Sequence, residues 1–255
     1  MAQGSRLRAW SGSGFAAALL LAPAVLAQVA FDVASIKESG VADGGMMRLM
    51  PGGGIRIQHL SARALITIAY QLQPYQLVSA PGWANETFYD IEAKPAGTAS
   101  REQTFVMLQA LLVERFRFSF HRESRQLDGF ALVRVRPDRL GPDLRPADVD
   151  CEKAFATSPR CRTGGITADT MTAVGTPIWS LLQLVIAKVG APVSDDTGLT
   201  GPYDFRLRWS NEVAPADDRP SIYAALQDQL GLKLERRRVT TQVVLVDRLE
   251  RAIPD

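Results

Sequence analysis

Apolar and polar side chains follow two periods along this chain. Alternation of apolar and polar positions over residues 31–37 and 203–209 predicts half-buried strands, and residues 116–121 alternate in the same way. Apolar side chains spaced three and four residues apart predict helices. These follow Ser61, span residues 102–114 and 177–188, and run from Ser221 to Leu230, where Gly231 is a plausible C-cap.

The order of these segments occurs twice. The stretches 54–136 and 165–250 each predict a strand, a helix, a Tyr-Asp strand, a polar linker, a second helix and two closing strands. Tyr89-Asp90 in the first stretch answers Tyr203-Asp204 in the second, 114 residues later. The repeat indicates an internal duplication, with chance similarity between two α+β segments as the alternative. We expect an α+β fold of two similar units, with mostly antiparallel sheet and helices packed on it.

Turn signals set the expected boundaries. Asp128-Gly129 is typical of a hairpin and predicts that the strand after residue 116 turns back into a second strand over 130–135. Glycines in the segment 40–54 predict a loop. We expect a leader over residues 1–27, a first α+β unit over 28–136, a linker over 137–164 and a second α+β unit over 165–255.

The first 27 residues are typical of a signal peptide. Arg6 and Arg8 precede an apolar run over 15–26, and Val25-Leu26-Ala27 places small residues where a signal peptidase cleaves. The run is too short for a permanent span and contains Pro23. We therefore expect a periplasmic or secreted protein with no transmembrane span after cleavage. An uncleaved N-terminal anchor is the alternative.

Removal of this leader changes the charge of the protein. The whole chain has 29 basic and 27 acidic residues, and the leader holds two arginines and no acidic residue, so 27 of each sign remain. A formally neutral chain lacks the electrostatic support that a nucleic-acid partner requires. Arg236-Arg237-Arg238 is a local basic run that we interpret as the solvated edge of a strand.

Cys151 and Cys161 are the two cysteines of the chain, and both lie in the polar linker. In an oxidising compartment we expect a disulfide, which would stabilise the protein by about 2–3 kcal/mol in the chain-entropy model. A metal site is the rival interpretation, but it needs further ligands, and neither histidine lies in the linker. A nucleophilic thiol is the other alternative.

Segments over almost all of the mature chain carry a resemblance to a known family. They read FDVASIK, FYDIEAK, LLVERFRFSFHRES, DDTGLTGPYDFRLRW and SIYAALQDQLGLKLE. The chain resembles a soil-associated bacterial family of exported proteins of unknown function. The resemblance implies no catalytic residue and no cofactor. Some relatives look as though they are joined to membrane metallopeptidases similar to those that sense β-lactams, which suggests a role in envelope sensing. A membrane sensor peptidase would then be a separate partner, because this chain lacks the multi-span part.

Candidate chemistry is sparse. His121 and Glu123 lie two apart on a predicted strand, so both point to one face and could hold a base or supply two metal ligands. A solvent-facing pair is the alternative. Asp196-Thr197-Gly198 matches the tripeptide of aspartic proteases, but a turn in which the aspartate accepts backbone hydrogen bonds explains it better.

Aromatic side chains offer a second kind of site. Trp83, Trp179 and Trp209 could line a ligand groove, although aromatics at repeated positions more often pack in a core. We expect a non-enzymatic binding or interaction module that recognises an unidentified protein or small molecule. A hydrolase that uses His121 and Glu123, or Asp196, is the alternative.

Overall fold

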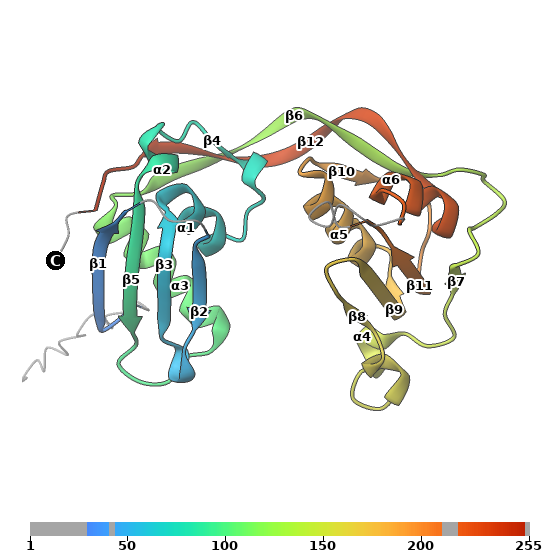
Figure 1. The fold of residues 1–255 in the computed structure, drawn as a ribbon, viewed down its shortest axis with the longest axis horizontal. Helices are drawn as coiled ribbons and strands as arrows, with labels where there is room; N and C mark the ends of the chain where they lie inside the picture. The colour runs from blue at the N-terminus through green and yellow to red at the C-terminus, as the bar shows by residue number, and fades with distance from the viewer. Residues whose placement is uncertain (1–29, 41–43, 211–218, 253–255) are drawn as a thin grey trace, which may run out of the picture.

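A computed structural model of the chain describes residues 30–40, 44–210 and 219–252. It consists of two α+β lobes joined by a long two-stranded ribbon (Figure 1). The signal peptide expected over residues 1–27 lies outside the described residues.

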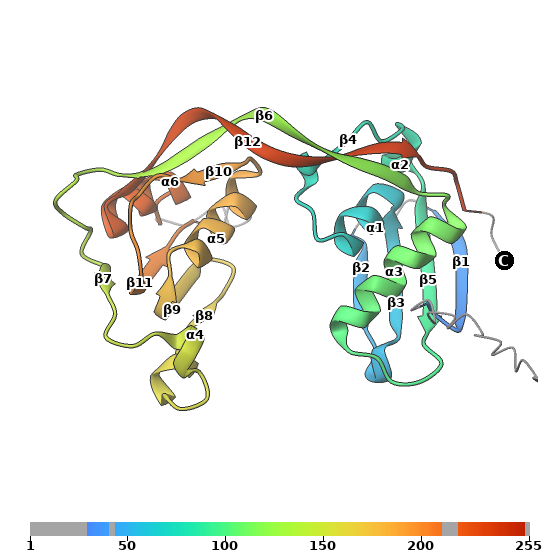
Figure 2. The same ribbon diagram turned by 180° about the vertical axis from the view of Figure 1, so that it is seen from behind.

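The first lobe is a four-stranded antiparallel sheet with helices on one face, as Figure 2 shows from behind. The sheet has the order β1-β5-β3-β2. Its elements are β1 (Val33–Ser39), β2 (Met46–Leu49), η1 (Pro51–Gly53), β3 (Ile55–Ser61), α1 (Ala62–Ala69), η2 (Pro74–Gln76), α2 (Trp83–Glu86), β5 (Phe88–Lys94) and α3 (Arg101–Arg115). Strand β2 lies in the segment expected to be a loop. It forms because four of its residues pair with β3 at the sheet edge.

Local signals explain where the helices of this lobe begin. The Ser61 side chain accepts a hydrogen bond from the backbone N–H of Ala64 at the start of α1. Ser100 and Gln103 form a capping box at the start of α3, so two otherwise unpaired donors are satisfied reciprocally. Both helices bury leucines against the sheet, where Tyr89 and Phe116 pack edge to face with ring centroids 4.9 Å apart.

The second lobe repeats this arrangement with a smaller sheet of order β7-β11-β9-β8. Its elements are β7 (Leu144–Pro146), α4 (Cys151–Ala154), η3 (Pro159–Arg162), β8 (Gly165–Ile166), β9 (Thr170–Pro177), α5 (Trp179–Val189), β11 (Pro202–Arg208), α6 (Ile222–Ala225) and the π-helical turn η4 (Leu226–Leu230). Gly231 caps this last helix with a φ of 68°, as the sequence predicts.

The ribbon is made of β6 (Ser119–Arg134) and β12 (Leu232–Arg248), which pair antiparallel along almost their whole length. Short strand β4 (Leu77–Val78) of the first lobe joins β12 in parallel, and β10 (Val193–Asp195) of the second lobe joins β6 in parallel. Each lobe is therefore tied to a long strand that begins in the other lobe (Figure 1).

The hairpin prediction at Asp128-Gly129 is wrong. Both residues lie inside β6, opposite Arg238 and Arg237 of β12, and the strand continues without a turn. A glycine is needed at this point for a different reason: a Cβ on Gly129 would lie 2.3 Å from the carbonyl oxygen of Pro192. The same pairing merges the two closing strands predicted after Gly231 into the single strand β12.

The α+β prediction is confirmed, with twelve strands in three mostly antiparallel sheets among the described residues. The order β3-α1-β4-β5-α3-β6 in the first half is matched by β9-α5-β10-β11-α6-β12 in the second. The second-half counterpart of β3 is β9, because both pair with the Tyr-Asp strand of their lobe. An internal duplication and the unit boundaries given above stay predictions.

Candidate functional site

The repeated Tyr-Asp pair has the same structural task in both lobes. In the first lobe, the register of β3 and β5 shifts between Ile57 and Leu60. At this bulge His59 has a φ of 52°, and its backbone N–H donates to Asp90 Oδ1 over 2.8 Å. The aspartate therefore satisfies a backbone donor that the bulge removes from the ladder.

The second lobe reproduces this bulge. Gly175 of β9 has a φ of 56°, and its backbone N–H donates to Asp204 Oδ1 over 2.9 Å. In the first lobe a histidine adopts this left-handed conformation, whereas in the second lobe the residue is glycine, which adopts it without strain. The Cβ of any other residue at 175 would also lie 2.4 Å from the carbonyl oxygen of Val149.

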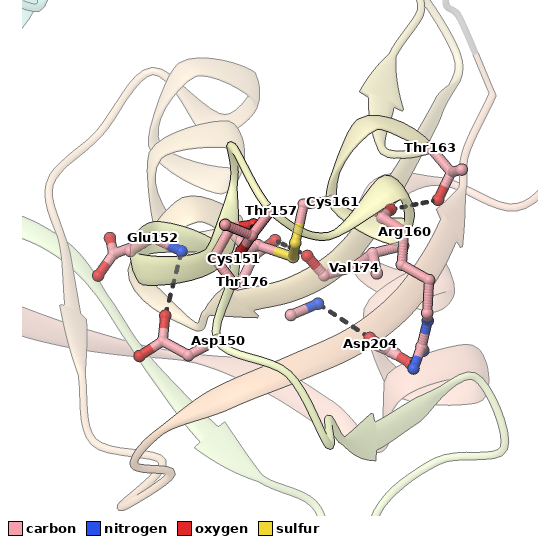
Figure 3. Close-up of a disulfide and its surroundings, with 12 residues drawn as sticks. Asp150, Cys151, Glu152, Thr157, Arg160, Cys161, Thr163, Val174, Thr176 and Asp204 are labelled. Carbon is pink, nitrogen blue, oxygen red and sulfur yellow. Dashed lines mark hydrogen bonds and ion pairs between the residues drawn. A yellow bond between two sulfur atoms is a disulfide. The ribbon is translucent and has the colours of Figure 1, made fainter.

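Asp204 differs from Asp90 in its second carboxylate oxygen. Its Oδ2 accepts hydrogen bonds from Arg160 Nη2 over 2.9 Å and from Arg145 Nη2 over 3.3 Å. The Asp204 side chain is 11% exposed, against 44% for Asp90. Figure 3 shows Arg160 reaching this carboxylate next to the disulfide. The bulge of the second lobe therefore carries a partly buried ion cluster, with Arg145 and Arg160 at Asp204.

A cavity of about 410 Å³ lies at this cluster, and we call it the arginine cavity. Three arginines line it: Arg145 of β7, Arg160 of η3 and Arg206 of β11. The carboxylates of Asp143 and Asp204 line it too. Arg160 also forms an ion pair with Asp148, which precedes the loop closed by the disulfide.

A second cavity, of about 420 Å³, lies beside the disulfide, and we call it the disulfide groove. Three large apolar side chains on its walls are mostly exposed: Phe155 at 60%, Ile166 at 62% and Trp179 at 53%. The indole Nε1 of Trp179 donates to Glu152 Oε1 over 3.1 Å. Both cavities share residues 172–174 of β9 in their lining.

The disulfide itself is placed as the sequence predicts. Cys151 and Cys161 lie at bonding distance, with an S–S separation of 2.00 Å, and close the loop that carries α4 and η3 (Figure 3). Asp150 begins α4 by accepting a hydrogen bond from the backbone N–H of Glu152. The loop forms one wall of each cavity, since Cys151 and Cys161 line the groove and Arg160 lines the arginine cavity.

The structure brings His121 and Glu123 together and adds a third residue. His121 Nε2 lies 3.1 Å from Glu123 Oε1, and His121 Nδ1 lies 2.7 Å from Asp247 Oδ1 on β12. Hydrogen bonds with Glu123 and Asp247 raise the pKa of His121 above 6.5. The hydrogen bond with His121, and then the one from Arg125, lowers the pKa of Glu123. Asp247 carries no sequence signal, because its approach depends on the ribbon pairing residues 126 apart.

This histidine cluster lies on open surface. The His121 side chain is 51% exposed, and those of Glu123 and Asp247 are 42% and 47% exposed. Among the described residues, no group of three or more His, Cys, Asp or Glu side chains has the arrangement of a metal site.

Asp196 is far from this cluster. Its backbone N–H donates to Leu132 of β6, eleven positions along the strand from His121, which is roughly 35 Å at the rise of an extended strand. Its carboxylate pairs with Arg237 over 2.7 Å. The turn acceptor is the preceding residue, Asp195, whose Oδ1 accepts from the backbone N–H and the hydroxyl of Thr197.

The two other tryptophans lie apart from each other and from the groove. Trp209 is 1% exposed in the second core, with Lys188 Nζ 5.1 Å from its ring centroid. Trp83 is half-buried against the first core, with the Arg251 guanidinium 5.6 Å from its ring centroid. No sequence pattern marks Phe155, Ile166 or the three cavity arginines, because these residues come together only when the loop folds.

The model of a family described as a protein of unknown function (DUF3738) matches residues 63–249 of the chain. The chain belongs to this family. The match covers the second lobe, the whole ribbon and the first lobe from α1 onward, and strands β1, β2 and β3 lie before it. It fits the uncharacterised family expected from the sequence. No curated protein and no solved structure matches the chain. No helix in the described parts of this family member is long and apolar enough to cross a membrane.

Proposed function

We propose that this protein is an exported, non-enzymatic binding module and that the disulfide groove of the second lobe holds its ligand. The observation that carries the proposal is the gathering of Phe155, Ile166 and Trp179 on one groove while each stays more than half exposed. Large apolar side chains grouped on a surface are typical of binding sites. Burial of the remaining exposed surface of each side chain under a ligand would contribute about 1–2 kcal/mol.

The size and the wall of the groove support a small ligand. Its volume of about 420 Å³ lies within the range of about 300–1,000 Å³ for small-molecule sites. The disulfide fixes the loop that supplies one wall, and a wall ordered in advance lowers the entropy cost of binding.

We also propose that the protein is exported and acts in envelope sensing. A disulfide is compatible with an oxidising compartment, which is the periplasm or the medium. The resemblance to a family in which some members look as though they are joined to membrane metallopeptidases supports a role in which a separate sensor peptidase recognises the occupied groove. From the same resemblance we infer that the protein comes from a soil bacterium.

No observation favours the hydrolase alternative. His121 and Asp196 lie at opposite ends of the ribbon, so they do not form one catalytic group. The histidine cluster is an exposed set of ion pairs, for which we propose a role in holding β6 to β12.

The groove can be tested with a neutral apolar dye, N-phenyl-1-naphthylamine, whose fluorescence rises on burial. We expect saturable binding by the wild-type protein and a loss of at least about tenfold in affinity for Trp179→Ala. Val106→Ala is the matched control, because Val106 is an exposed apolar residue on α3, at 48%, in the other lobe. Equal binding by both variants would contradict the proposed site.

A further inference from the structure

The arginine cavity brings together three guanidinium groups from separate segments of the chain. Arg145 comes from β7, Arg160 from the loop closed by the disulfide, and Arg206 from β11. Cations gathered in this way repel one another unless acidic groups or a bound anion compensate. The ability of this cavity to bind an anion therefore depends on how much of this positive charge its own acidic residues neutralise.

Two of the three guanidinium groups are held in place by acidic residues. Arg160 donates from Nη1 to Asp148 and from Nη2 to Asp204. Arg145 donates from Nη2 to the same Asp204 oxygen. Asp204 is itself fixed by the backbone N–H of Gly175 at the β9 bulge. The cluster is thus positioned before any ligand arrives, which is what a binding site requires.

Several cationic donors at the cavity remain unused. The Arg206 side chain has no hydrogen bond or ion pair with any residue of the described ranges 30–40, 44–210 and 219–252. Arg145 uses one of its five N–H donors, through Nη2. Guanidinium donors in a fork match carboxylate and phosphate oxygens in pairs, and such charge-assisted bonds are stronger than neutral ones.

Acidic groups oppose an anion here, since Asp143, Asp148 and Asp204 equal the three arginines in formal charge. The carboxylate of Asp143 lines the cavity and is exposed, and within the described part of the chain it has no ion-pair partner. Its backbone carbonyl accepts a hydrogen bond from the Arg206 backbone N–H, which places the two residues side by side. A bound anion would feel repulsion from Asp143 and attraction from Arg206 at the same time.

We propose that the arginine cavity binds an anionic group, a carboxylate or a phosphate, with Arg206 as its main partner and Arg145 as the second. Arg160 and Asp204 act as positioning residues, because the ion pair between them holds the cluster together. The site does not depend on the disulfide groove, although the shared lining over residues 172–174 places the two cavities next to each other.

The test is titration of the full mature chain with inorganic phosphate and, separately, with sodium acetate, followed by amide chemical shifts. We expect saturable shifts in β11 and η3 for at least one anion, and affinity that falls as sodium chloride is added. Arg206→Ala should weaken binding by about tenfold or more, because it removes charge-assisted bonds. Arg208→Ala is the matched control: Arg208 is exposed on the same strand but does not line the cavity, so its loss should change affinity less than about twofold.

A gain-of-binding variant separates the proposal from a folding defect. Asp143→Asn removes the opposing charge, so it should strengthen binding severalfold. Shifts with phosphate alone would assign a phosphate site, and shifts with acetate alone a carboxylate site. The proposal is overturned if neither anion binds, if Arg206→Ala and Arg208→Ala weaken binding equally, or if Asp143→Asn does not strengthen it. Dye binding in the groove is a separate readout, so either site can fail alone.

Discussion

Gly129 provides the sharpest test of the ribbon, because it decides between a hairpin and a continuous strand. It lies in β6 where β10 joins from the second lobe, and the backbone N–H of Phe130 donates to the carbonyl oxygen of Pro192 over 3.0 Å. We consider Gly129→Ala, which adds a single Cβ at this crossing.

The cost of that Cβ follows from the distances. It would lie 2.3 Å from Pro192 O and 2.9 Å from Pro192 Cγ, whereas ordinary contacts begin near 3.4 Å. The strands would have to separate by about 1 Å, since the obstacle is backbone and cannot rotate away. Packing strain of about 1–3 kcal/mol and the loss of one hydrogen bond, at about 0.5–1.5 kcal/mol, add to a destabilisation of about 1.5–4.5 kcal/mol.

Urea unfolding followed by circular dichroism measures this change as a shift in midpoint. Gly97→Ala is the matched control, because no heavy atom lies within 4 Å of a Cβ built there. That variant should be neutral or slightly stabilised, by reducing the entropy of the unfolded chain. If Gly129→Ala unfolds within about 0.5 kcal/mol of the control, the close approach of β6 and β10 is refuted.

Two further predictions concern the ribbon. Ending the chain after Arg238 removes Val243 and Val244, which are 0% and 2% exposed. The first lobe should then lose hydrogen-exchange protection, although its own helices are intact. Unchanged protection would contradict the sharing of β12 between the lobes. The pKa of His121, measured by NMR, should lie above 6.5 and fall in Asp247→Asn. Because the folded pKa is raised, the contribution of this cluster to stability is present below pH 6.5 and is lost as pH rises through the folded pKa; an unchanged pKa in the variant would refute the contact.

Part of the candidate site was accessible from the sequence. The pairing of Cys151 with Cys161 required little information, because two cysteines ten residues apart in a polar linker leave few alternatives. The closeness of His121 and Glu123 follows from strand periodicity alone. The third member of that cluster, Asp247, was out of reach because nothing in the sequence fixes the register of β6 against β12.

Local patterns were sufficient to predict most helices and strands of this protein. Ser61 and Ser100 begin helices, and Gly231 ends one, because capping bonds join residues at most a few positions apart. The α+β class followed from the same local periods. Such interactions are written into neighbouring residues and need no knowledge of the rest of the chain.

The pairing of the long strands and the gathering of charged side chains depend instead on the fold of the whole chain. Asp128-Gly129 forms no turn, because sixteen paired positions between β6 and β12 satisfy more backbone groups than one turn would. Arg145, Arg160 and Arg206 converge because the loop folds back over β11 and Asp204 fixes two of their side chains. Contacts of this kind depend on the path of the whole chain, which no local pattern records.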